Sequence, residues 1–157
     1  MASTSAFGIA CAGLTAALAT SSYAAPPPIA GQRELASHSV TVEIAGLRNA
    51  HGVVRMCMTR RAESFPVCAP GSQSASVPAR KGAVRYEFKD VPDGDYAVAV
   101  FHDANGNGKL DRSLGIPREG FAFSQNPPLR PRAPTFKECR FTLKGQANLQ
   151  LKLRYIL

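Results

Sequence analysis

The residues best suited to chemistry lie between Asp103 and Asp111, in the segment DANGNGKLD. Side chains that carry oxygen recur there at every second residue, and Gly108 stands where a calcium loop of the EF-hand kind needs a sharp bend. Counted from Asp103, oxygen ligands take the first, third, fifth and ninth positions of that pattern, and the seventh offers a backbone carbonyl. The predicted ligands of a calcium ion are Asp103, Asn105, Asn107, Asp111 and the carbonyl of Lys109, with Glu119 as the nearest further acid.

This segment departs from a true EF-hand. Its twelfth position is Leu114, where an EF-hand has a bidentate glutamate, and neither flank has the periodicity of a long amphipathic helix. A metal-free turn is the alternative, because Asn and Asp side chains also cap their own backbone, and Lys109, Arg112 and Arg118 could neutralise the aspartates. With few carboxylates, a calcium site here should be weak, with a Kd of about 10⁻⁴ M, and should support the fold rather than transmit a signal.

The elements that position this segment are predicted to be β-strands, because apolar residues on both sides of it alternate with a period of two. Residues 96–101 are apolar on both faces, which is typical of a strand inside a sheet. The first two alternating runs, joined by the turn LRNAHG, are predicted to form a hairpin. The runs in question cover residues 40–44, 54–58, 84–89, 139–143 and 149–155, and a further strand is expected near 121–124.

About seven short strands, separated by Gly- and Pro-containing turns, predict an all-β fold for residues 38–157. The expected architecture is an antiparallel β-sandwich of immunoglobulin-like or prealbumin-like shape. A length of 157 residues and a hydrophobic fraction of 45% are sufficient for one domain with a real core. Functional groups are expected in the two long loops, at residues 59–81 and 103–135.

The beginning of the chain resembles an export signal. Residues 1–32 carry no charged side chain, and an apolar run ends in SSYAAPPP. This pattern predicts a signal peptide at residues 1–24 and a Pro-rich linker at residues 25–37, with a periplasmic or secreted mature protein that has no transmembrane segment. An uncleaved anchor and a disordered leader are the alternatives, and lipidation at Cys11 is disfavoured because no leucine stands three positions before it.

The other cysteines are Cys57, Cys68 and Cys139, in a compartment that would permit disulfides. Cys57 is expected on the outward face of its strand and Cys68 in the following loop, and the two are predicted to pair. Cys139 is in phase with apolar neighbours and is expected to be a small core residue. A zinc site built from Cys57, Cys68 and a histidine is the alternative, although no CxxC pair supports it.

Two other functions compete with calcium binding. A metal-free pocket for a small molecule or glycan would be built by His102, Glu119 and Ser124. A hydrolase is the third hypothesis, because a histidine beside carboxylates can act as a general base, and His51 and Asp103 extend that set. No nucleophile motif of the GxSxG kind surrounds Ser124, so a non-enzymatic protein is expected.

The chain is strongly basic, with a formal net charge of +8. An exported protein does not meet nucleic acid, so the predicted partner is anionic lipid or polysaccharide of the envelope. A solvated surface of scattered cations is the alternative. The cations beside the predicted calcium segment are Arg112, Arg118, Arg130 and Arg132.

The longest recognisable pattern is the run VPDGDYAVAVFHDANGNGKLDRSLGIPREGFAFSQNP, which the segments FKECRFTL and LQLKLRY follow. Over nearly all of the mature chain, this pattern resembles a family of small exported bacterial proteins known as domain of unknown function 2141. The resemblance implies an envelope location and an all-β sandwich, and it implies no established activity. Ala122 and Cys139 depart from the small residues common in the family, and neither is a predicted ligand. The residues that match the family's motif are His102, Asp103, Asn105, Asn107, Gly108, Asp111, Gly115, Pro117, Glu119, Gly120, Phe123 and Ser124.

Overall fold

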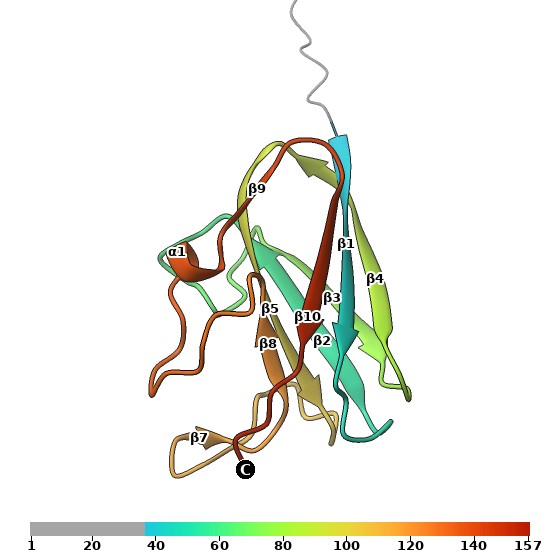
Figure 1. Ribbon diagram of the computed structural model, residues 1–157, viewed down its shortest axis with the longest axis vertical. Coiled ribbons are helices and arrows are strands. Elements are labelled where there is room, and N and C mark those ends of the chain that lie inside the picture. The colour runs from blue at the N-terminus through green and yellow to red at the C-terminus, as the bar shows by residue number, and fades with distance from the viewer. Residues whose placement is uncertain (1–36) are drawn as a thin grey trace, which may run out of the picture. The chain divides into compact units, whose positions relative to one another are not determined.

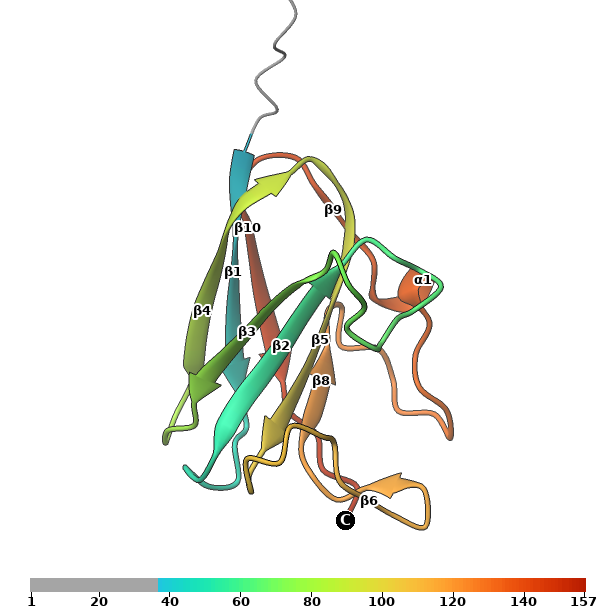
Figure 2. The same ribbon diagram turned by 180° about the vertical axis from the view of Figure 1, so that it is seen from behind.

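Two β-sheets face each other in the computed structural model, which describes residues 37–157 (Figures 1 and 2). The predicted signal peptide, residues 1–24, lies outside the described residues. The predicted linker, residues 25–37, also lies outside them apart from Ser37, which is the first residue of β1. The prediction of an all-β sandwich is confirmed.

The first sheet has the strand order β10–β1–β4, and the second has the order β3–β2–β5–β8, with β9 paired to the first residues of β5. The small β6–β7 hairpin and the one-turn helix α1 complete the fold. The strands of the first sheet are β1 (Ser37–Ala45), β4 (Val84–Pro92) and β10 (Ala147–Lys152). Those of the second are β2 (Val53–Thr59), β3 (Gln73–Pro78), β5 (Gly94–Asp103), β8 (Phe121–Phe123) and β9 (Phe141–Leu143). The remaining elements are β6 (Arg112–Ser113), β7 (Ile116–Pro117) and α1 (Phe136–Cys139).

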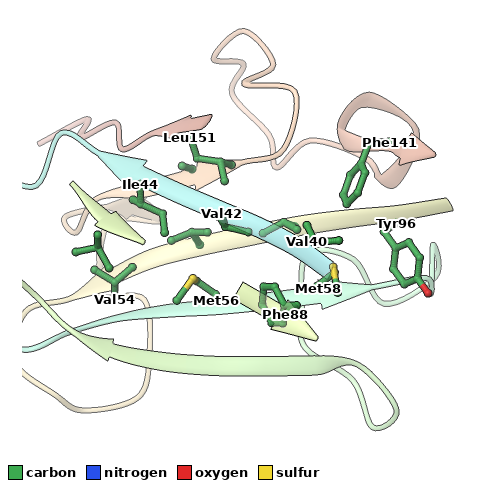
Figure 3. Packing of buried hydrophobic residues seen from close by; sticks show 14 of the residues in the cluster. Val40, Val42, Ile44, Val54, Met56, Met58, Phe88, Tyr96, Phe141 and Leu151 are labelled. Atoms are coloured by element: carbon green, nitrogen blue, oxygen red, sulfur yellow. The ribbon is translucent and has the colours of Figure 1, made fainter. Parts of the chain in front are cut away.

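The core lies between the two sheets, as the alternation of apolar residues requires. Figure 3 shows the side chains of β1 facing those of β2, with the rings of Tyr96 and Phe141 at one end of the cluster. Burial of each such aliphatic or aromatic side chain stabilises the fold by about 1.5–3 kcal/mol. The labelled members are Val40, Val42, Ile44, Val54, Met56, Met58, Phe88, Tyr96, Phe141 and Leu151.

The hairpin predicted from residues 40–44 and 54–58 is wrong. β1 pairs with β4 and β10, whereas β2 pairs with β3 and β5 in the other sheet. The connecting turn, residues 46–52, is almost entirely exposed and passes from one sheet to the other at the end of the sandwich, so the two apolar faces meet across the core instead of lying side by side. Alternation specifies which face of a strand is buried, but it does not specify the neighbour to which the strand is hydrogen-bonded.

Two further features differ from the expectation. The β1–β10 pair is parallel, so the sandwich is not antiparallel throughout. Residues 37–157 contain ten strand segments instead of the predicted seven or so, because β3, β6 and β7 were missed. β3 has the polar sequence QSASVP and pairs only with β2 on the edge of its sheet, and such a strand has no strong apolar alternation to reveal it.

The prediction of a disulfide between Cys57 and Cys68 is confirmed, with an S–S distance of 2.04 Å. Cys57 points away from the core, as its place in β2 predicts, yet it is buried. Cys139 is the free cysteine of the described residues and is fully buried, as expected, although it lies in α1 and not in a strand. Its burial and, to a smaller extent, the nearby charge of Glu138 together raise the pKa of the thiol to about 12.

Candidate functional site

The loop that contains the predicted calcium ligands is closed at its base by β5 and β8. β5 ends at Asp103, and β8 begins at Phe121 in antiparallel register with it. The backbone N–H of His102 donates to the carbonyl of Gly120 at 2.8 Å. The 103–119 loop therefore leaves and re-enters the sheet at neighbouring positions, and it includes the β6–β7 hairpin at one end of the sandwich (Figures 1 and 2).

Asp103 is fully buried at the start of the 103–119 loop. Its Oδ2 accepts hydrogen bonds from Arg55 Nε at 2.6 Å and from the Gly108 N–H at 2.9 Å, and its Oδ1 accepts one from the Asn107 N–H at 3.0 Å. Arg55 reaches this carboxylate because β2 lies beside β5, with Val53 paired to Asp103 and Arg55 on the same face of β2. The carboxylate thus fixes the first turn of the loop and anchors it to β2.

The charge of Asp103 is maintained by its partners. Burial alone raises the pKa of this carboxyl group, but hydrogen bonds from Arg55, Gly108 and Asn107 together outweigh the effect of burial. The pKa therefore lies below its ordinary value of 3.8. Asp103 is ionised at neutral pH, and the guanidinium group of Arg55 balances its charge.

The other predicted side-chain ligands of the first turns converge on Asp111. Asn105 Nδ2 donates to Asp111 Oδ2 at 2.7 Å, and Asn107 Nδ2 donates to Asp111 Oδ1 at 2.9 Å. The oxygen of each amide turns back to the loop, with Asn105 Oδ1 accepting from the Asn107 N–H and Asn107 Oδ1 from the Lys109 N–H. The structure therefore brings Asn105, Asn107 and Asp111 together, with amide N–H groups filling the space between them.

Glu119 closes the loop from its other side. Its Oε1 accepts from the Ala104 N–H at 2.9 Å and its Oε2 from the Asp111 N–H at 3.0 Å, and the residue is only 8% exposed. The Arg118 N–H donates to the carbonyl of Asp111 at 2.9 Å. Both oxygens of Glu119 thus hold the backbone, and the side chain ties the beginning of the loop to its middle.

His102 and Ser124, proposed from the sequence as pocket residues, are both buried and hydrogen-bonded. His102 Nδ1 lies 3.0 Å from Tyr155 Oη, and its Nε2 lies 2.8 Å from the carbonyl of His51. Ser124 Oγ donates to the carbonyl of Cys139 at 2.6 Å and accepts from the Val98 N–H. Val98, the partner of Ser124, precedes His102 by four residues along β5, so Ser124 lies about 13 Å along the strand from His102. His102, Glu119 and Ser124 therefore do not line one pocket.

Among residues 37–157, no three His, Cys, Asp or Glu side chains lie close enough to hold a metal ion together. The alternative of a zinc site at Cys57 and Cys68 is wrong, because the two sulfur atoms are joined in a disulfide and are not free thiolates. Calcium also accepts amide and carbonyl oxygens, and an ionised carboxylate has about four acceptor positions. Asp103 uses three of these positions and Asp111 two, so the loop keeps some capacity for a hard cation.

Two residues of this site were missed in the sequence. Lys109, Arg112 and Arg118 were considered as counter-ions for the aspartates, but the cation that pairs with Asp103 is Arg55, 48 residues earlier. The second missed residue is Tyr155. Its ring packs so closely against Gly120 that a Cβ added at Gly120 would lie 2.4 Å from the ring. Only the pairing of β2 with β5, and of residues 121 and 154, places these side chains here.

Comparison with known proteins identifies a family. The model of a family described as an uncharacterised protein conserved in bacteria, DUF2141, matches residues 42–150. This range includes the whole 103–119 loop and strands from both sheets. No curated protein and no solved structure matches the chain. No helix in the described part of the chain has the length and apolar character needed to cross a membrane.

Proposed function

Because this chain belongs to the bacterial family DUF2141, we propose that it is an exported, non-enzymatic β-sandwich protein whose 103–119 loop binds a calcium ion of structural importance. The convergence of Asn105 and Asn107 on the carboxylate of Asp111 carries this proposal. Three oxygen-bearing side chains share one small space there, beside the buried charge of Asp103. Calcium is the biological cation that best accepts such a mixture of carboxylate, amide and carbonyl oxygens.

Binding would require the amide groups to rotate. A half-turn of the terminal torsion of Asn105 and of Asn107 exchanges nitrogen for oxygen and directs both oxygens toward Asp111, with no movement of the backbone. Each rotation gives up two hydrogen bonds, one from a backbone N–H and one to Asp111, at a cost of about 1 kcal/mol each that the bound cation has to offset. Arg55 already neutralises Asp103, which lowers the attraction for a cation. Both effects favour a weak site with a Kd of about 10⁻⁴ M, as extracellular calcium modules have.

The remaining parts of the proposal rest on other residues. The Cys57–Cys68 disulfide supports export, since disulfides persist in oxidising compartments. The absence of catalysis is supported by the hydrogen bonds of His102 and Ser124, because each side chain is buried and fully engaged inside the fold. A general base or nucleophile needs to reach a substrate, and neither group is placed to do so.

Calcium should stabilise the chain against heat. At about 1 mM calcium and a Kd of about 10⁻⁴ M, mass action adds about 1.4 kcal/mol to the free energy of unfolding. For a domain of this size the Tm should rise by about 5 °C. The measurement is thermal unfolding of the mature chain in calcium, in magnesium and in EDTA.

Two matched variants make this test specific. Asp111→Asn keeps the size of the side chain but removes a charged ligand, so the rise in Tm with calcium should disappear. Asp93→Asn removes the same charge from an exposed carboxylate that pairs with His38, and it should keep the full rise. An equal response to magnesium, or a calcium response that survives in Asp111→Asn, would count against the proposal.

A further inference from the structure

We propose that the β6–β7 hairpin and the C-terminal residues form a docking surface for an anionic lipid bilayer. This inference goes beyond the calcium site and does not depend on it. The surface, which we term the hairpin surface, combines exposed aliphatic side chains with cations that have no acidic partner among residues 37–157. Its members are Leu114, Ile116, Ile156, Leu157, Lys109, Arg112 and Arg118.

The tip of the hairpin exposes a large apolar residue at a cost to the fold. Leu114 is 101% exposed and has a φ of 49°, and Gly115 follows with a φ of 81°. Positive φ at both central residues is typical of a type I′ turn, in which Asn-Gly is preferred. Leucine in the left-handed region costs about 1–2 kcal/mol, and this side chain recovers nothing by burial. Strained backbone positions cluster at functional sites, so this exposed leucine points to a contact with a partner.

Further apolar side chains lie at the same end of the sandwich. The backbone of Arg154 exchanges hydrogen bonds of 2.9 and 3.0 Å with Phe121, which follows the 103–119 loop. Arg48 Nη1 donates to the Leu157 carbonyl oxygen at 2.6 Å and so fixes the last residue. In both Figure 1 and Figure 2 the C-terminal end lies beside the β6–β7 hairpin. Ile156 is 46% exposed and Leu157 is 52% exposed there, which extends the apolar area beyond the tip.

The charges of this surface fit an anionic partner. Arg112, Arg118 and Lys109 are exposed, and none of them forms an ion pair with another residue of 37–157. By contrast, Arg130 and Arg132 both pair with Glu138, whose single negative charge offsets one of their two positive charges.

Free cations around exposed aliphatic side chains are the combination that binds the interface of anionic membranes. A polysaccharide would use the cations but would leave the aliphatic side chains without a role.

The test is co-sedimentation of the mature chain with phosphatidylglycerol vesicles and with phosphatidylcholine vesicles, in EDTA so that calcium plays no part. Binding is expected only to the phosphatidylglycerol vesicles, and it should weaken as salt is raised. Leu114→Gln should weaken binding about tenfold or more, because it removes the side chain that inserts. Arg112→Gln combined with Arg118→Gln should have an effect of similar size.

The matched control is Leu129→Gln, which removes a leucine of 53% exposure from a different loop and should bind like the original chain. All of these residues are exposed, so the variants should fold, and their Tm values check this. Equal binding to both vesicles, no binding at all, or equal losses in Leu114→Gln and Leu129→Gln would overturn the proposal. So would a concentration-dependent dimer that Leu114→Gln abolishes, since the occupant would then be a second copy of the chain.

Discussion

Replacing Asp103 by alanine should lower the free energy of unfolding by about 3–5 kcal/mol. The carboxylate is fully buried, and the change would leave the guanidinium of Arg55 without its partner at 2.6 Å. It would also leave the N–H groups of Asn107 and Gly108 without the acceptor that fixes the first turn. Urea unfolding at neutral pH, in EDTA, measures the loss.

The control for this prediction is Asp93→Ala, because that carboxylate is 58% exposed and forms its ion pair with His38 at the surface. Its loss should cost less than about 1 kcal/mol. If Asp103→Ala also cost less than about 1 kcal/mol, Asp103 would not be the anchor of the loop.

The same residue predicts how stability depends on pH. Since the pKa of Asp103 is lower in the folded chain than its ordinary 3.8, protonation favours the unfolded chain. The contribution of the ionised Asp103 to the free energy of unfolding is therefore complete above about pH 4. It is lost as the pH falls below that value, toward the pKa of the folded state. Asp103→Asn cannot titrate, so the gap in stability between it and the original chain should narrow as the pH is lowered from 6 to 3. A constant gap would contradict the assigned role.

Replacing Gly52 by alanine should destabilise the fold almost as much as Asp103→Ala, lowering the free energy of unfolding by about 2–5 kcal/mol. A Cβ at this position would lie 2.0 Å from the carbonyl oxygen of Asp103, and Gly52 has a φ of 68°. The left-handed conformation costs a non-glycine residue about 1–2 kcal/mol, and the overlap with a backbone atom adds about 1–3 kcal/mol. Urea unfolding of the variant gives the total.

The two contributions can be separated with Gly82→Ala. Gly82 has a φ of 87°, but a Cβ there would meet nothing within 4 Å, so only the conformational cost of about 1–2 kcal/mol applies. The difference between the variants measures how closely the turn before β2 packs against the start of the 103–119 loop. Equal losses of stability in Gly52→Ala and Gly82→Ala would mean that the contact between Gly52 and the Asp103 carbonyl does not affect stability.

The sandwich itself could be predicted because burial of one face imposes a period of two on the strands that form the core. Val40, Val42 and Ile44 of β1 are all fully buried, as their spacing indicated, and so is Val54 of β2. The assignment of strands to sheets could not be predicted, because β1 and β2 have the same pattern whether they pair or face each other. β3 escaped because an edge strand of small polar residues carries no such pattern.

The closeness of Asn105, Asn107 and Asp111 could be predicted from the sequence, but the counter-ion of Asp103 could not. Asn105, Asn107 and Asp111 lie close together in the sequence, so their spacing alone indicated that they would meet. Arg55 belongs to a strand that pairs with β5 over a long separation, and the choice among many arginines could not be made locally. Glu119 was predicted as a further metal ligand from its closeness in the sequence, but the two backbone N–H groups that its oxygens accept from could not be predicted.

The claim that the 103–119 loop binds calcium is tested most directly by following the backbone amide resonances of the chain as calcium is added. We expect the largest changes at Asn105, Asn107 and Asp111, with half-saturation at about 10⁻⁴ M calcium, while the amides of β1 and β10 stay unchanged. If these amides did not move up to about 5 mM calcium, far above the expected Kd, the loop would be a metal-free structure held by Arg55 and its own hydrogen bonds.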